Sequence, residues 1–303
     1  MGIRRHTVHL LARTLPTLGK LSDMRLLTLG VQDCYFTYEE IITFLQRHGI
    51  PLRPLQASDV SPTAGFKWAA PEEFEIYRRY IHQKTFFRVL GFSPENICSL
   101  DASGYEGADI IHDLNQPVPS SLHSRFDLIF DGGTIHYVLS VKDALVNVCR
   151  MCKLGGCVVN FNPIDYSDHG FLGLNADVFR EFFLTNGFEQ VCLKYIGIPA
   201  HHRRIDEHYV EWSRDQFQYS LQPYYTTAVY SVFKKIAEKS PTVPLQSMYR
   251  DLHGATRVSA RHQRPWLHRA MARVLRDVID AYFVPSMLVR GLLSIRRGER
   301  VAL

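Results

Sequence analysis

Three polar or flexible positions in this chain directly follow apolar segments: Gly30, Asp101 and Asp131. A glycine lets a ligand approach the main chain closely, and a carboxylate offers two acceptor oxygens to a pair of hydroxyl groups. In a doubly wound sheet, ligands bind beyond the carboxyl ends of the strands. If the apolar segments are strands of one such sheet, the three loops that begin at these residues are expected to meet in one crevice.

The elements that must position these residues alternate between strand and helix. Apolar runs predict strands, and apolar residues at helical spacing with glycine or proline behind them predict helices. The predicted strands are 25–29, 96–100, 126–130, 157–161, 190–196 and 224–233, and the predicted helices are 38–48, 71–90, 141–153 and 175–186. The expected helix at 141–153 is ended by Gly155 and Gly156. This order predicts an α/β fold, a doubly wound, mostly parallel sheet with helices on both faces.

The chain divides into three predicted regions. Residues 1–24 form an N-terminal extension, 25–235 form the α/β domain with a helical insertion at about 51–92, and 236–303 form a basic, amphipathic helical tail. Residues 255–303 hold ten arginines and no lysine against three acidic residues, whereas the rest of the chain is close to neutral. Three interpretations of this tail stay open: a helix docked on the body, a helix in the interface of an anionic membrane, and, least favoured, a nucleic-acid contact.

Composition limits the class of protein. With 303 residues, 46% hydrophobic and 21% charged, the chain can bury a full core. The six cysteines are scattered through predicted strands and helices, which indicates reduced thiols and a cytoplasmic protein, peripheral at the membrane if the tail binds lipid. Cys149 and Cys152 are spaced as Cys-x-x-Cys on one helix without a second pair, so no metal site is expected. We expect neither a signal peptide nor a spanning helix.

Several motifs along residues 25–235 resemble those of class I S-adenosylmethionine-dependent methyltransferases. They are LLTLGVQD at 26–33, SLD at 99–101, FDLIFDGGT at 126–134 and LGG at 154–156. The resemblance implies a Rossmann-like methyltransferase fold and S-adenosylmethionine as cofactor. It also implies methyl transfer to oxygen or nitrogen of a small-molecule or sugar-like acceptor. The first loop departs from the family because it holds one glycine, Gly30.

The resemblance assigns cofactor contacts to seven residues. These are Gly30, Gln32 and Asp33 in the first loop, Asp101 for the ribose hydroxyls, Asp113 for the adenine amino group, and Asp131 and Gly132 after the fourth strand. A purely structural role stays open for each acid, because a carboxylate after a strand also caps the following turn. The separation of Gly30 from Asp101 far exceeds the roughly twenty residues of dinucleotide folds. A helical insertion must therefore lie between them.

Four residues are candidates for acting on the acceptor. His136 resembles a histidine often found at this place in the family, and histidine suits proton transfer near neutral pH. Asp131, five residues earlier, is the second catalytic candidate, with turn capping as its alternative. His136 could equally pack at a helix start. His169 lies in a loop where acceptor contacts occur in the family. His201 lies in a dense polar cluster after the sixth predicted strand, in a loop that either faces the substrate or is solvated.

Two other function classes remain open. A methyltransferase-like scaffold or membrane-associated binding module would explain a glycine-poor first loop. A dinucleotide-dependent oxidoreductase uses the same sheet, but it needs the first-loop glycines more strictly than this chain provides.

Overall fold

The computed structural model describes residues 2–63, 71–165, 170–199, 208–217, 225–244 and 299–302. His169, His201 and the predicted amphipathic helix of the tail lie outside these residues. Among the described helices, none is long and apolar enough to cross a bilayer.

One nine-stranded sheet organises the chain, in the order β3-β2-β1-β4-β5-β8-β6-β7-β9. The strands are β1 (Leu26–Leu29), β2 (Ile97–Asp101), β3 (Ile110–Ile111), β4 (Phe126–Asp131), β5 (Cys152–Pro163), β6 (Phe188–Pro199), β7 (His208–Trp212), β8 (Tyr225–Lys235) and β9 (Glu299–Ala302). The first five strands in the order are parallel, and β8 is antiparallel to both β5 and β6. Only β7 and β8 among the described strands run against the others, so the predicted mostly parallel sheet is confirmed.

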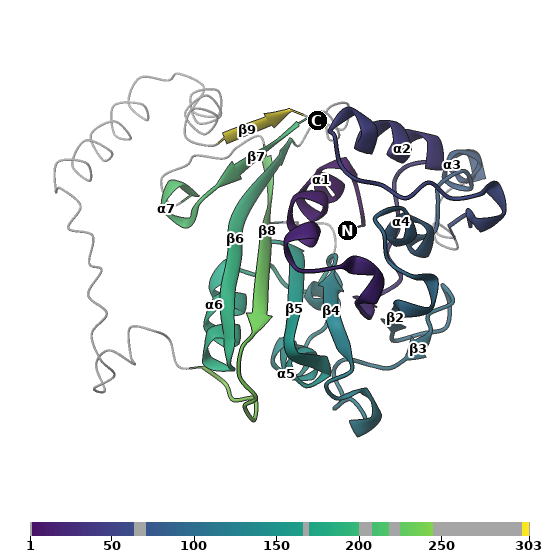
Figure 1. Cartoon of the computed structure of the whole chain (residues 1–303). Helices are drawn as coiled ribbons and strands as arrows, with labels where there is room; N and C mark the ends of the chain where they lie inside the picture. The colour runs from purple at the N-terminus through teal and green to yellow at the C-terminus, as the bar shows by residue number, and fades with distance from the viewer. Residues whose placement is uncertain are drawn as a thin grey trace, which may run out of the picture.

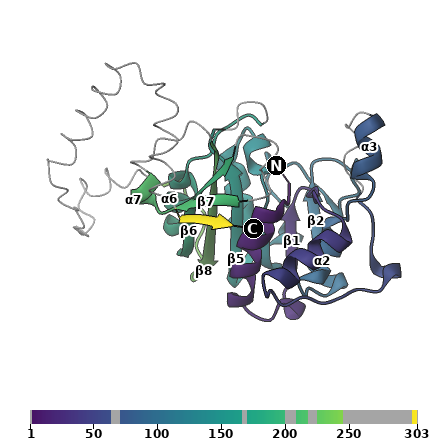
Figure 2. The ribbon, with the colours of Figure 1, turned by 90° about the horizontal axis from the view of Figure 1, so that it is seen from above.

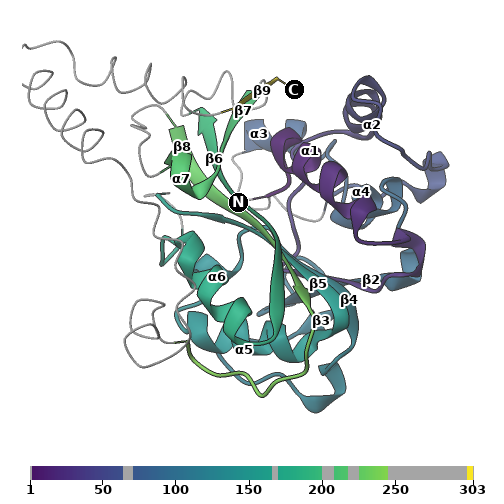
Figure 3. The ribbon, with the colours of Figure 1, turned by 60° about the vertical axis from the view of Figure 1, so that its left-hand side comes forward.

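Helices cover both faces of the sheet, as the predicted doubly wound fold requires. They are α1 (Arg5–Thr14), α2 (Tyr38–Arg47), α3 (Pro71–Tyr77), α4 (Gln83–Val89), α5 (Val141–Met151), α6 (Ala176–Thr185) and the short α7 (Arg214–Phe217). Helices α5 and α6 lie on one face of the sheet, and α1, α2 and α4 lie on the other (Figures 1 and 3). Seen from above, β1 and β2 with α2 lie toward one end of the molecule and β6 to β8 toward the other (Figure 2).

Local signals explain where several helices begin. At α2, Thr37 and Glu40 form a capping box, in which each side chain accepts from the other residue's main-chain N–H. The Asn175 side chain accepts from Asp177 N–H at the start of α6. The buried central strand β4 has no exposed position, which matches its nearly continuous apolar sequence.

Two elements differ from the sequence prediction, and two segments contain elements that it did not include. The single helix expected at 71–90 is two helices, because His82 caps α4 and the chain between them pairs with other segments. Helix α5 ends at Met151 and β5 begins at Cys152, so Gly155 and Gly156 lie within an irregular strand instead of ending the helix. The extension 1–24 contains the helix α1. The tail predicted as helical ends in the strand β9.

Candidate functional site

A cleft of about 470 Å³ lies at the carboxyl ends of β1, β2 and β4. The residues that line it are Gly30, Val31, Gln32, Asp33, Leu100, Asp101, Ala102, Glu106, His112, Asp113, Leu114, Asn115, Gly133, Thr134, Tyr137 and Val138. It therefore brings together five of the predicted cofactor residues, namely Gly30, Gln32, Asp33, Asp101 and Asp113. This is the crevice expected where parallel strands of such a sheet diverge.

Gly30 is the point at which the first loop leaves β1. Its N–H donates to the Leu100 carbonyl at 2.7 Å, which ties the loop to β2. Its φ of 74° is favourable only for glycine, and a β-carbon there would stand 2.6 Å from Thr134 Oγ1. A larger residue at this position would both strain the main chain and collide with the loop after β4.

Gln32 occupies the space that a second glycine would leave open. Its Nε2 donates to the Leu29 carbonyl at 2.6 Å and to Thr134 Oγ1 at 3.2 Å. The Thr134 hydroxyl donates to the same Leu29 carbonyl at 2.6 Å. The Gln32 N–H donates to the Gln83 side chain at 2.8 Å, and Gln83 is the first residue of α4. The loop after β1 is thus held by the side chains of Thr134, from the loop after β4, and of Gln83, from α4. These contacts take the place of the glycine-rich main chain that is usual in such a loop.

Asp131 shapes the turn after β4. Its Oδ1 accepts from the N–H groups of Gly133, Thr134 and Ile135, at 3.2, 2.7 and 3.3 Å, and its Oδ2 accepts from Asn162 Nδ2 at 2.6 Å. The side chain is fully buried, and burial raises its pKa, while these four hydrogen bonds act in the opposite direction. Asp131 is not among the residues that line the cleft, and neither is Gly132. The cofactor contacts predicted for these two residues stay untested predictions.

Two exposed or half-exposed acids line the cleft at its β2 and β3 side. Asp101 Oδ1 accepts from the Ser103 N–H at 3.0 Å. Asp113 Oδ1 accepts from the N–H and the side-chain amide of Asn115, and these bonds lower the pKa of Asp113. Both acids therefore cap the turns that follow them, as the alternative interpretation held. In both, however, Oδ2 has no hydrogen-bond partner among the described residues, which leaves one oxygen for a ligand.

Asp33 lines the same cleft and is half-buried. Burial raises the pKa of its carboxyl group to about 6. No side chain in the described part of the chain donates a hydrogen bond to this carboxylate. Partial desolvation of a carboxylate without a side-chain donor is unfavourable, and a bound cation or hydrogen-bond donor would offset it.

The electrostatic character of the cleft follows from its lining. Asp33, Asp101, Glu106 and Asp113 are acidic, and none of the described residues that line the cleft is lysine or arginine. Such a cleft favours a ligand that carries positive charge and disfavours one that carries phosphate groups.

His136 is buried beside the cleft instead of lining it. Its side chain is 1% exposed, and the imidazole lies so near Gly170 that a β-carbon there would be 2.0 Å from its Cδ2 atom. The His136 carbonyl accepts from the N–H groups of Phe171 and Leu172. For the predicted role as a base, residues 170–172 would have to move away from the ring, so catalysis by His136 stays a prediction.

Sequence reasoning missed several residues that the structure places in the site. Glu106, His112, Asn115 and Tyr137 line the cleft, and Gln83 supports it from α4. Thr134 also lines the cleft, and the motif at 126–134 could have indicated it, because Thr134 directly follows the paired glycines after β4. Within the described residues, no group of three or more His, Cys, Asp or Glu side chains is arranged to hold a metal ion.

No protein-family model matches this chain, and no curated protein matches it. Solved structures that resemble it include the YcgJ protein from Bacillus subtilis, at 12% identity over 76% of this chain and 99% of that chain, with a TM-score of 0.37. A TehB-like S-adenosylmethionine-dependent methyltransferase from Corynebacterium glutamicum is 13% identical over 74% of this chain and 86% of that chain, with a TM-score of 0.37. An S-adenosylmethionine-dependent methyltransferase from Aquifex aeolicus is 10% identical over 73% and 87%, with a TM-score of 0.33. The assignment of the fold rests on the strand order and helix placement given above.

Proposed function

We propose that this protein binds S-adenosylmethionine in the acidic cleft and transfers its methyl group to oxygen or nitrogen of a small-molecule or sugar-like acceptor. The observation that carries the proposal is the set of four carboxylates at the ends of β1, β2 and β3, without a basic residue in the described lining. S-adenosylmethionine has a sulfonium and an ammonium group against one carboxylate, so its net charge complements this lining. A dinucleotide brings a pyrophosphate, which four carboxylates would repel.

The residues of the cleft fit the parts of this cofactor. Asp101 Oδ2 would accept from the ribose hydroxyls, and Asp113 Oδ2 from the adenine amino group. Asp33 would face the positively charged part. When bound, S-adenosylmethionine supplies an activated methyl group, which leaves its sulfur for a nucleophilic atom of the acceptor. The protein's share in such a displacement is alignment, because a single step with one transferred carbon depends chiefly on geometry.

Asp131 contributes to this alignment in the proposal as a positioning residue. It holds the Gly133 and Thr134 main chain, and Thr134 in turn holds the Leu29 carbonyl beside Gly30. Loss of the Asp131 carboxylate would therefore alter the loop after β4 and the loop after β1 together.

Calorimetry on the purified protein tests the proposal. We expect binding of S-adenosylmethionine and S-adenosylhomocysteine in the micromolar range and no heat from NADH. Asp101→Ala should weaken binding by about tenfold or more, equivalent to about 1.4 kcal/mol. Asp23→Ala, which removes an exposed acid far from the cleft, is the matched control. If none of the three ligands binds, the proposal is wrong and a non-catalytic scaffold is the better interpretation.

A further inference from the structure

Residues 2–4 pair with the loop that carries Asp33. The Ile3 N–H donates to the Asp33 carbonyl at 2.7 Å, and the Tyr35 N–H donates to the Ile3 carbonyl at 3.0 Å. Ile3 and Cys34 form a parallel bridge, and Ile3 is fully buried. Residues 2–4 of the N-terminal extension therefore hold the loop after β1 through main-chain hydrogen bonds.

The fit between this piece and the loop is close. A β-carbon on Gly2 would lie 2.4 Å from the Asp33 carbonyl oxygen and 2.7 Å from the Tyr35 ring. Contacts this short are not tolerated, so Gly2 must be a glycine if the loop is to keep its place. The Arg4 guanidinium lies over the Tyr35 ring, 3.8 Å from its centroid, and adds a cation–π contact on the same side.

Helix α1 continues from these residues across the sheet. His6 packs against Phe161 of β5, with ring centroids 5.6 Å apart, and the Tyr230 hydroxyl of β8 donates to Thr14 Oγ1 at 2.8 Å. The His6 ring also lies 6.5 Å from the Tyr209 ring of β7. The first turn of α1 therefore lies against both β5 and β7.

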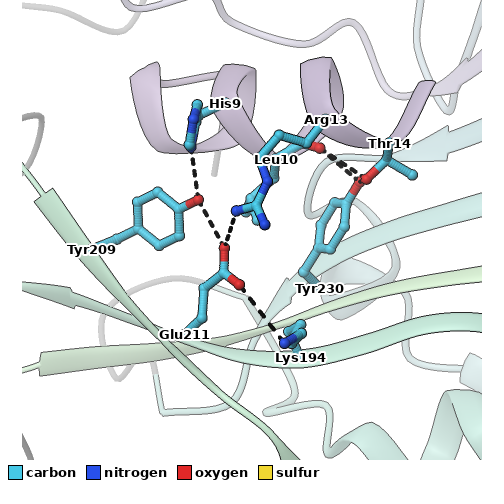
Figure 4. A network of polar contacts seen from close by, with 8 residues as sticks. All are labelled: His9, Leu10, Arg13, Thr14, Lys194, Tyr209, Glu211 and Tyr230. Carbon is cyan, nitrogen blue, oxygen red and sulfur yellow. Dashed lines mark hydrogen bonds and ion pairs between the residues drawn. The ribbon is translucent and has the colours of Figure 1, made fainter. Parts of the chain in front are cut away.

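At β7 the helix is anchored by a buried carboxylate (Figure 4). Glu211 is 3% exposed, and its Oε1 accepts from Arg13 Nη1 at 2.8 Å and from the Tyr209 hydroxyl at 3.0 Å. Lys194 Nζ lies 3.9 Å from its other oxygen. His9 Nδ1 lies 2.9 Å from the Tyr209 hydroxyl. Two turns of α1 thus reach the same carboxylate, directly through Arg13 and through Tyr209 from His9.

This anchor needs the docked helix for its closest charged contact. Glu211 is buried, whereas the Arg13 side chain is 54% exposed and reaches the carboxylate from α1. Without α1, the carboxylate on β7 would keep the Tyr209 hydroxyl and Lys194, whose ammonium lies 3.9 Å away, but would lose the 2.8 Å contact with Arg13.

We propose that residues 2–14 are a strap that forms part of the cofactor site, in which the Arg13–Glu211 anchor fixes α1 and residues 2–4 set the position of Asp33. This inference rests on the proposed function for the identity of the ligand, but the strap itself rests on contacts within the chain. In it, Gly2, Ile3 and Arg13 are positioning residues that act on the ligand through Asp33.

Binding of S-adenosylhomocysteine to Gly2→Ala is the first test. The added methyl should displace the Asp33 carbonyl and weaken binding by at least tenfold. The melting temperature, measured alongside, separates this local displacement from a general loss of the fold. Thr17→Ala, an exposed change on the same extension, should bind like the parent. Tight binding by Gly2→Ala, equal to that of the parent, would overturn the role of the strap in the site.

Amide exchange gives a readout that needs no ligand. The Tyr35 N–H, which donates to Ile3, should be protected in the parent and lose protection in Gly2→Ala and in Arg13→Met. The double variant Arg13→Met with Glu211→Gln removes both charges and should recover much of the protection lost in Arg13→Met. If the parent fails to bind S-adenosylhomocysteine, the proposed function is wrong, and the strap is then tested by amide exchange alone. Unchanged protection of the Tyr35 N–H in both single variants would contradict the strap.

Discussion

The side-chain carbonyl of Gln32 lies against Gly132, at a distance where a β-carbon on Gly132 would stand only 2.3 Å from Oε1. One residue belongs to the loop after β1 and the other to the loop after β4, so the long side chain in the first loop depends on the small residue in the second. Gly132→Ala should therefore expel Gln32 from its bonds to Leu29 and Thr134. Overpacking of this kind costs about 1–3 kcal/mol, and we expect a loss of affinity for S-adenosylhomocysteine of about tenfold by calorimetry.

A double-mutant cycle makes this coupling measurable. Once Gln32 is alanine, the added methyl on residue 132 has room, so Gly132→Ala should cost little further affinity in that background. Gly104→Ala, where the nearest atom would be 3.8 Å from the new carbon, is the matched control and should change nothing. Equal costs of Gly132→Ala in both backgrounds would contradict the contact.

The pH dependence of binding should follow Asp33. A cation needs the carboxylate form, and the pKa of this group is raised to about 6 by burial. Affinity for S-adenosylmethionine should therefore rise as pH increases from 5 to 7 and then level off. In Asp33→Asn the affinity should be lower and flat over that range. Isothermal titrations at several pH values decide this, and an unchanged slope in the variant would remove Asp33 from the ligand contacts.

The same carboxyl group should make the unliganded protein less stable as pH rises. Its pKa is raised in the folded state above the ordinary value of 3.8, so between about pH 4 and 6 the folded chain keeps a proton that the unfolded chain has lost. The free energy of unfolding should fall by up to about 3 kcal/mol across this window. Asp33→Asn should remove that decline, so that at pH 8 the variant is more stable in urea than the parent although it binds less well.

Lys235 should be a major contributor to stability without any role in the site. Its side chain is 4% exposed, and its ammonium donates to the carbonyls of Cys149 and Cys152 at 3.0 Å each and pairs with Glu238. Lys235→Met removes this donor from two buried carbonyls, one in the last turn of α5 and one at the start of β5, at a cost of about 2–4 kcal/mol. Urea unfolding should show this loss, while Lys239→Ala, an exposed lysine nearby, should change stability little.

Asp131 should be sensitive to the loss of its acceptor oxygens more than to the loss of its charge. Asp131→Leu keeps the size but removes the acceptor for three N–H groups and Asn162, and should cost about 3 kcal/mol or more. Asp131→Asn keeps an oxygen for the N–H groups, and Asn162 can turn its amide to accept from the new one. The asparagine variant should therefore retain most of the stability in chemical unfolding. Equal losses in the two variants would contradict this account.

The parts of the fold that could be predicted are those whose signals are local. The apolar run at 126–130 with glycines behind it located β4, and acids placed directly after strands located Asp101 and Asp131. The directions in which the Asp101 and Asp131 side chains point could not be predicted, because they depend on packing in the folded chain. Asp101 lines the cleft, whereas Asp131 turns inward to the N–H groups of its own loop.

The parts that could not be predicted depend on partners far along the chain. Helix α1 has no side-chain cap, and its polar partners lie on β7 and β8, about two hundred positions away. The break between α3 and α4 depends on a bridge between Pro62 and Ile81, which no periodicity reveals. The role of Gln32 could not be read from its loop either, since its hydrogen-bond partner Thr134 follows β4.

The anchor at Glu211 also sets an order of events during synthesis. Residues 5–14 are synthesised about two hundred positions before β7, and Arg13 and His9 meet their partners only after β7 has been made. A helix of ten residues is marginal on its own in water. Helix α1 is thus translated well before the strand that secures it, and a nascent chain stalled before residue 208 would expose the apolar side of α1 to chaperones.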